Sequence, residues 1–189
     1  NLTLDFREEA PGKAHRDMYL DAAGNVIAGL SENGHLASGV PGTVAGMFEA
    51  LQYARLPFRT LIQPAIELAE KGFVLNASEA RGLNAAKKEF IKYSSRRPAF
   101  VHETGWKAGD TLIQKELAET LKRIRDNGAA GFYEGETAQL IVEEMKKGKG
   151  MISLEDLKAY KAIWREPVTF GYKGYEIITM PLPSSGGVL

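Results

Sequence analysis

The chain of 189 residues contains no cysteine, which excludes disulfides, thiolate metal ligands and cysteine nucleophiles. Histidine is scarce as well. His15, His35 and His102 lie in separate segments, and their spacing matches no metal-binding motif. We therefore expect neither a metal nor another cofactor.

The chain also lacks an excess of charge of either sign, because its 24 Lys and Arg residues balance 24 Asp and Glu residues. This balance argues against nucleic acid as the main partner and against electrostatic attachment to a membrane. No apolar run approaches the roughly 20 residues that a spanning helix requires, so we expect no membrane insertion in this segment. The first residues do not have the pattern of a signal peptide.

Apolar residues at helical spacing dominate the middle of the chain. The stripes at 62–69, 117–124 and 138–145 each end at a glycine, and residues 76–91 form a longer, more polar helical stretch. A further helix is expected to start near Thr43, and the spacing of Ser153 and Asp156 predicts a capping box. These patterns predict a mainly α-helical body.

Strand-like patterns appear toward both ends. Residues 168–172 and 175–180 are rich in β-branched and aromatic residues and flank Lys173-Gly174, which predicts a hairpin. A second hairpin is predicted at 18–27, around the turn at 22–25. The expected fold class is mainly α with peripheral β-strands that belong to a larger sheet. Both ends of the chain are expected to continue into further elements.

Several motifs favour a structural interpretation over a chemical one. Gly39, Gly42 and Gly46 lack the P-loop and dinucleotide patterns, so they predict a tight turn and a closely packed helix. The Ser-Ser-Gly-Gly segment at 184–187 forms no nucleophile elbow and is interpreted as a turn leading into a helix. The paired acids at 8–9, 143–144 and 155–156 are expected to be solvated. The lysines near 146–149 suit the C-terminal end of a helix.

Arg7 is the strongest candidate for a binding residue. It follows a predicted strand and opens a loop that contains Pro11, and binding groups are commonly mounted at such positions. A guanidinium there can offer a bidentate fork to a carboxylate. Exposed arginines are common, however, and the residue type alone does not identify a ligand.

A family resemblance supplies the missing ligand. The segment Asp5-Phe6-Arg7-Glu8, continued by Ala10-Pro11 and by 13–18, resembles the substrate-arginine segment of γ-glutamyltransferases, also called glutathione hydrolases. Five further blocks similar to that family follow in family order and span nearly the whole chain. They are His35–Gly46, Gly131-Phe132-Tyr133-x-Gly135, Ile152–Tyr160, Tyr172-x-Gly174-Tyr175 and Met180–Gly187.

The resemblance implies an N-terminal-nucleophile hydrolase with an αββα sandwich, made as a precursor that cleaves itself into a large and a small subunit. It identifies residues 1–189 as a single fragment of the large subunit, with a helical lobe. The strand and loop with the substrate arginine occupy 1–38, the helical body 39–166, and the β-hairpin and final loop 167–189. The implied location is periplasmic or extracellular.

The resemblance also implies the chemistry. A threonine that begins the small subunit attacks a γ-glutamyl amide such as glutathione, and the γ-glutamyl group passes to water or to an acceptor amino acid or peptide. Arg7 matches the arginine that binds the donor α-carboxylate. The implied partners are therefore the small subunit, the donor and the acceptor. The fragment begins with Asn1 and supplies no catalytic residue, so we expect it to be inactive alone.

Two alternatives remain open from the sequence. One is a related member of the superfamily that acts on another amide, such as an acylase or a poly-γ-glutamate-processing enzyme. The other is a helical interaction domain that has lost catalysis.

Overall fold

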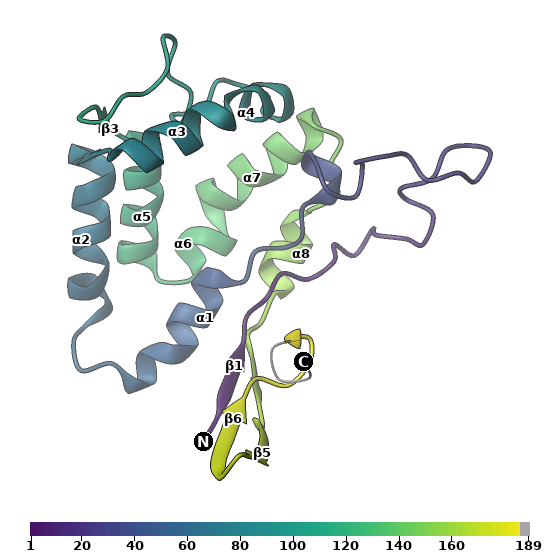
Figure 1. The fold of residues 1–189 in the computed structure, drawn as a ribbon, viewed down its shortest axis with the longest axis vertical. Helices are drawn as coiled ribbons and strands as arrows, with labels where there is room; N and C mark the ends of the chain where they lie inside the picture. The colour runs from purple at the N-terminus through teal and green to yellow at the C-terminus, as the bar shows by residue number, and fades with distance from the viewer. Residues whose placement is uncertain (186–189) are drawn as a thin grey trace.

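The computed structural model describes residues 1–185, and helices are its main regular elements (Figure 1). The helices are α1 Thr43–Ala50, α2 Phe58–Lys71, α3 Ala77–Ala85, α4 Lys87–Tyr93, α5 Lys115–Asn127, α6 Ala130–Tyr133, α7 Gly135–Lys147 and α8 Leu154–Ala159, with short 3-10 turns at His35–Ala37 and Leu51–Tyr53. The strands pair antiparallel as β1 Thr3–Asp5 with β4 Ile163–Arg165, β2 Phe73–Val74 with β3 Thr111–Leu112, and β5 Val168–Tyr172 with β6 Tyr175–Thr179. The coarse prediction of helices with peripheral strands is confirmed, since the strands form two-stranded sheets within the described residues. That they belong to a larger sheet stays a prediction.

The predicted helical stripes form the core. Ile62 and Ile66 of α2 and Ile124 of α5 are buried where these two helices lie side by side, and Val142 of α7 joins the same cluster (Figure 1). Leu157 of α8 is completely buried against it. Burial of these side chains stabilises the helices more than their intrinsic propensity does.

Glycine ends α2 and α5 as the pattern predicts. Gly72 has φ +84° and Gly128 has φ +65°, a left-handed region that L side chains rarely adopt. Gly148 ends α7 without a positive φ, and the basic residues Lys146 and Lys147 occupy the last turn of that helix, as expected. The capping box at Ser153 and Asp156 is present at the start of α8.

Three predictions about secondary structure need correction. The segment 76–91 is two helices rather than one stretch, with the break at Ala86. At 18–27 the turn forms but the strands do not, since only Leu20 and Val26 make an isolated bridge and Val26 is 75% exposed. Without an apolar surface beneath them, two short strands gain too little burial to form. The third correction is that β1 pairs within the chain, with β4, which the sequence did not predict.

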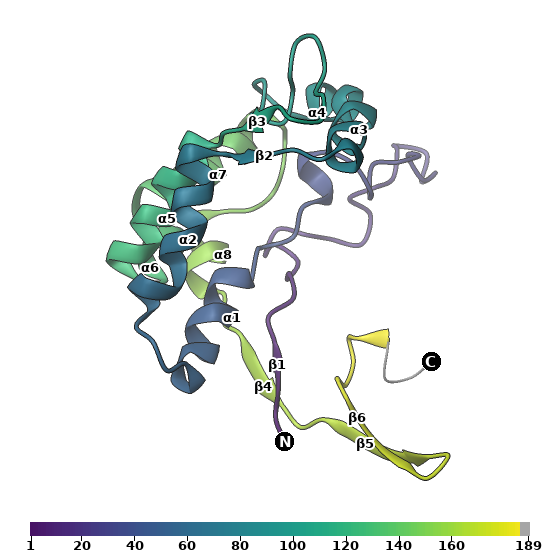
Figure 2. The ribbon, with the colours of Figure 1, turned by 60° about the vertical axis from the view of Figure 1, so that its left-hand side comes forward.

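The β5–β6 hairpin is confirmed, and its turn has φ +48° at Lys173 and φ +84° at Gly174. It projects away from the helical body in both views (Figures 1 and 2). Ser184 and Ser185 follow it, whereas Gly186 and Gly187, and with them the predicted turn into a helix, lie outside the described residues. Within residues 1–185, no helix is both long and apolar enough to cross a membrane.

Candidate functional site

Arg7 lies two residues beyond the end of β1, at the strand-to-loop position that the sequence predicts. Its side chain is 56% exposed and contacts one acidic group, Glu8 Oε1, at 3.4 Å from Nη2. An exposed pair of this kind contributes only about 0–1 kcal/mol, so a ligand carboxylate can replace it at small cost. The Arg7 guanidinium is therefore available to a ligand.

The backbone around Arg7 is fixed, in contrast to its side chain. The Arg7 N–H donates to Asp5 Oδ1 at 3.2 Å, and the Tyr160 hydroxyl donates to the Arg7 carbonyl at 2.7 Å. Two residues further on, Glu9 and Val40 exchange backbone hydrogen bonds of 3.2 and 2.8 Å. The loop that carries Arg7 is thus held from both sides.

Asp5 connects this loop to β4. Its Oδ2 accepts a 2.8 Å hydrogen bond from Arg165 Nε, and its side chain is 10% exposed. Burial pushes the pKa of Asp5 upward, but the hydrogen bonds from Arg165 and from the Arg7 N–H, with the two guanidinium charges, outweigh burial and lower that pKa overall. Asp5 therefore stays ionised and is occupied by Arg165, so it does not compete for the Arg7 guanidinium.

The glycines at 42 and 46 allow the Arg7 loop to pack closely on α1. A Cβ at Gly46 would lie 2.3 Å from the Phe6 ring, and one at Gly42 would lie 2.2 Å from the Phe6 carbonyl oxygen. The predicted tight turn and closely packed helix are confirmed, and their role is to seat Phe6, the neighbour of Arg7.

The histidines do not form a metal site. Within residues 1–185, no group of three or more His, Asp or Glu side chains is arranged to hold a metal ion. His35 instead lies against α7, where its Nε2 is 2.9 Å from Glu144 Oε1, and the Ser95 hydroxyl donates to Glu144 Oε2. These hydrogen bonds, from Ser95 first and then His35, hold the pKa of Glu144 at about 2 despite partial burial.

The prediction that the paired acids are solvated is therefore wrong for Glu144 in the pair 143–144 and for Asp156 in the pair 155–156. Glu144 joins His35 and Ser95, which belong to different segments of the chain. Asp156 caps α8 and also accepts a 2.8 Å hydrogen bond from the Gly12 N–H. Both acids brace the fold, and neither has the raised pKa of a catalytic acid.

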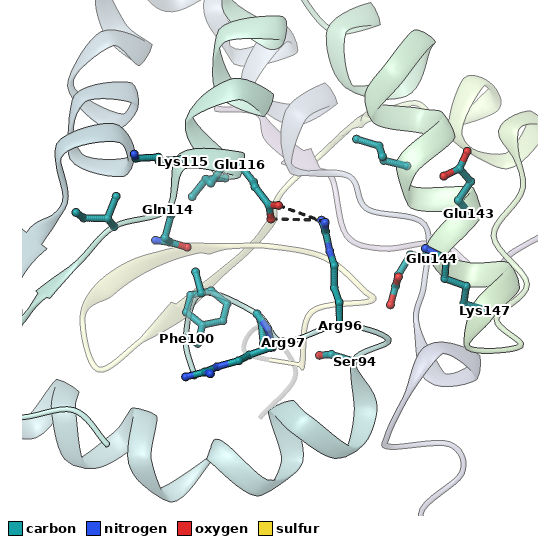
Figure 3. Close-up of a pocket in the computed structure, with 15 residues that line it drawn as sticks. Ser94, Arg96, Arg97, Phe100, Gln114, Lys115, Glu116, Glu143, Glu144 and Lys147 are labelled. Atoms are coloured by element: carbon teal, nitrogen blue, oxygen red, sulfur yellow. Dashed lines mark hydrogen bonds and ion pairs between the residues drawn. The ribbon is translucent and has the colours of Figure 1, made fainter. Parts of the chain in front are cut away.

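A cleft of about 750 Å³ has a lining that does not include Arg7 (Figure 3). Its walls come from the 94–100 loop, the start of α5 and one side of α7. Arg96 crosses it to pair with Glu116 at 3.2 Å, and Arg97 Nε donates to the Val101 carbonyl. Pairing does not separate Arg96 from Arg7, since both make exposed ion pairs. We favour Arg7 because it lies in the segment that resembles the substrate-arginine segment of the family.

Sequence reasoning selected Arg7 but missed the residues that hold it. Asp5 and Tyr160 lie in two of the family blocks and Arg165 in none, but nothing in the sequence links any of them to the Arg7 backbone, and Tyr160 lies 153 positions from Arg7. A helix-ending tyrosine and a strand-ending aspartate are common features that gain meaning only from their contacts.

Comparison with known proteins agrees with the sequence blocks. The family described as Gamma-glutamyltranspeptidase matches residues 1–189. The chain is 45% identical over 188 residues to the glutathione hydrolase proenzyme of Escherichia coli K12, covering 98% of this chain and 32% of that protein. It is also 45% identical over 153 residues to the capsule biosynthesis protein CapD proenzyme of Bacillus anthracis, covering 80% of this chain and 28% of that protein.

The fold has the same relatives. The solved gamma-glutamyltranspeptidase of Helicobacter pylori superposes with a TM-score of 0.95 and 49% sequence identity, covering 99% of this chain and 54% of that one. The chain spans about a third of the length of the curated relatives it matches. The family match over the whole chain and this superposition lead to one conclusion: the chain belongs to the gamma-glutamyltranspeptidase family, whose members include N-terminal-nucleophile hydrolases made as proenzymes.

Proposed function

We propose that this chain is the substrate-gripping part of the large subunit of a γ-glutamyltransferase, and that Arg7 binds the α-carboxylate of the γ-glutamyl donor. The observation that carries the proposal is an exposed guanidinium on a fixed backbone: Arg7 is 56% exposed, while its N–H and carbonyl are both hydrogen-bonded. A guanidinium forms two parallel hydrogen bonds to a carboxylate, which a lysine cannot do.

In this proposal the rest of the precursor supplies the reacting groups. A threonine hydroxyl at the start of the small subunit attacks the γ-glutamyl carbonyl, and its own α-amine accepts the proton. The amide C–N bond then breaks, the amine leaves with that proton, and water or an acceptor amine takes the γ-glutamyl group from the threonine ester. The helices described above then form a lobe of the large subunit, with the Arg7 segment within 1–38, the helical body within 39–166 and the hairpin within 167–189. The isolated chain is accordingly inactive, and we place the mature protein in the periplasm or outside the cell.

Substitution of Arg7 in the complete enzyme tests the proposal. Arg7→Ala and Arg7→Lys should both raise the KM for a γ-glutamyl donor, by roughly ten- to a hundredfold for Arg7→Ala, because a charge-assisted hydrogen bond contributes about 1.5–3 kcal/mol. Steady-state kinetics with glutathione measures the effect.

Arg16→Ala is the matched control. Arg16 belongs to the same resembling segment, its side chain is 95% exposed, and its one ion pair, with Asp17, is 3.7 Å long. The control should leave KM unchanged. A KM for Arg7→Ala equal to that of the wild type would disprove the assignment.

The likeness to CapD, whose solved structure is described as a transpeptidase, favours a second candidate: a transpeptidase that acts on a γ-glutamyl amide other than glutathione. Both candidates use Arg7 for a carboxylate and differ in the rest of the donor. Comparing kcat/KM for glutathione and for poly-γ-glutamate in the complete enzyme distinguishes them, since the true donor class should give the higher value.

A further inference from the structure

Tyr160 is buried beside the Arg7 loop although it lies far away in the sequence. It ends α8, is 7% exposed, and its hydroxyl donates a 2.7 Å hydrogen bond to the Arg7 carbonyl. The neighbouring glycine leaves room for this approach, since a Cβ at Gly42 would lie 1.9 Å from the Tyr160 hydroxyl. The hydroxyl is thus confined between α1 and the Arg7 peptide.

The Arg7 peptide depends on this contact for its position. Within residues 1–185, the Arg7 side chain makes one ion pair, the exposed 3.4 Å pair with Glu8, and a pair of this kind does not fix where the guanidinium lies. Its placement is set by the Cα and therefore by the groups that hold the backbone. The Arg7 peptide groups themselves are held by Asp5 on the N–H side and Tyr160 on the carbonyl side, and the Glu9–Val40 pair holds the loop two residues further on. A displacement of about 1 Å in a binding group can cost a large fraction of its effect.

We propose that Tyr160 is a positioning residue that aims Arg7 at the donor carboxylate, a role that rests on the proposed function of Arg7. The hydroxyl serves as the donor at any pH at which such an enzyme is assayed. Burial first, and then Tyr133 and the acids Glu9, Asp5 and Glu8, raise the pKa of Tyr160 to about 12. The hydrogen bond to Arg7 is therefore not lost by ionisation near neutral pH.

Tyr133 offers a matched control for the hydroxyl of Tyr160. The two rings stack in parallel, with centroids 5.9 Å apart and an interplanar angle of 6°, and both side chains are 7% exposed. The Tyr133 hydroxyl donates to the Pro41 carbonyl at 2.8 Å and accepts from the Ala45 N–H at 3.2 Å. Removing either hydroxyl breaks a buried hydrogen bond to the backbone, but only the loss at Tyr160 removes a hydrogen bond to the Arg7 peptide.

The test measures recognition of the carboxylate itself. In the complete enzyme, kcat/KM is determined for a γ-glutamyl anilide and for the same anilide with its α-carboxylate replaced by a carboxamide. Tyr160→Phe should lower the ratio of the two values by about three- to tenfold, the effect of one hydrogen bond, mainly through a higher KM for the carboxylate donor. Tyr133→Phe should keep the wild-type ratio even if both variants lose the same thermal stability.

Each outcome of this test either supports or overturns the positioning role of Tyr160. A wild-type ratio in Tyr160→Phe, or an equal fall in Tyr133→Phe, overturns it and leaves Arg7 untouched. If Arg7→Ala itself keeps the wild-type ratio, the proposed function fails first. Should Tyr160→Phe not fold, Tyr160→Met puts a smaller, adaptable apolar side chain without the donor at the same place, and the same fall in the ratio is expected.

Discussion

At the scale of single residues, two helical glycines differ in whether close packing or helix propensity decides the effect of a substitution. A Cβ at Gly46 in α1 would lie 2.3 Å from the Phe6 ring, whereas one at Gly82 in α3 would meet nothing within 4 Å. Both positions are helical, so alanine improves the local preference at both by roughly 0.5–1 kcal/mol.

We predict opposite outcomes for these substitutions. Gly46→Ala should lower the free energy of unfolding by about 1–3 kcal/mol through overpacking, and Gly82→Ala should raise it by about 0.5–1 kcal/mol. Urea unfolding of the chain measures both. Equal changes in the two variants would show that Phe6 moves aside without cost.

Glu144 makes the stability of the fold depend on pH in the acidic range. Its pKa of about 2 lies below the ordinary value of 4.5, because Ser95 and His35 hydrogen-bond to the ionised carboxylate. A lowered folded-state pKa means that ionised Glu144 stabilises the fold above about pH 4.5, and that this contribution is lost as the pH falls from 4.5 toward 2.

Glu144→Gln should therefore lower the free energy of unfolding by roughly 1–2 kcal/mol at pH 6, with the difference from wild type vanishing near pH 2. Glu143→Gln on the exposed side of the same helix should change stability by less than about 0.5 kcal/mol. Thermal unfolding from pH 2 to pH 6 tests this, and a difference that stays constant with pH contradicts the assignment.

At the scale of elements, two capping boxes share a local design but differ in their surroundings. In α3, Glu79 accepts from the Asn76 N–H. In α8, Asp156 accepts from the Ser153 N–H and also from the Gly12 N–H, 144 positions away. The second box therefore fastens the segment after Arg7 as well as its own helix.

Alanine at the third helical position should reveal this difference. Glu79→Ala should cost about 0.5–1 kcal/mol, typical of a cap, whereas Asp156→Ala should cost about 1–3 kcal/mol because it also leaves Gly12 without its partner. Chemical denaturation measures both costs, and hydrogen exchange at Gly12 should accelerate in Asp156→Ala alone. Equal costs with unchanged exchange would show that the Gly12 contact adds nothing.

At the scale of the whole molecule, the apolar face of the β5–β6 hairpin stands out. Register places Phe170 beside Ile177 and Tyr172 beside Tyr175 on one face, with exposed fractions of 43% for Phe170 and 73% for Tyr175. The hairpin projects from the helices, and a two-stranded hairpin is marginally stable by itself (Figure 2). Such a face favours association.

We predict that the 189-residue chain self-associates through this face. The double variant Phe170→Lys/Tyr175→Lys should weaken association at least about tenfold, since lysine places charges where association would bury two aromatic side chains. Val74→Lys, on the separate β2–β3 pair and 65% exposed in the wild type, is the control. Sedimentation velocity over a range of concentrations measures the self-association of each variant. Equal association of both variants would place the contact elsewhere.

The sequence by itself determined the helices and the identity of the binding candidate. The stripes that became α2, α5 and α7, the glycines that end them and the Ser153 cap are local signals, since each depends on residues within a few positions of one another. The ordered family blocks pointed to Arg7, and its predicted role as the carboxylate-binding residue stays a prediction.

Only the tertiary structure decided how Arg7 is held. The contacts from Tyr160 to Arg7 and from Arg165 to Asp5 join residues more than 150 positions apart, and the one from Glu144 to His35 joins residues 109 apart. β4 forms only because β1 lies beside it, and the expected strands at 18–27 are absent because nothing covers them. Periodicity and capping depend on interactions between residues close in the sequence. Contacts of the kind described here arise only when packing brings distant segments together.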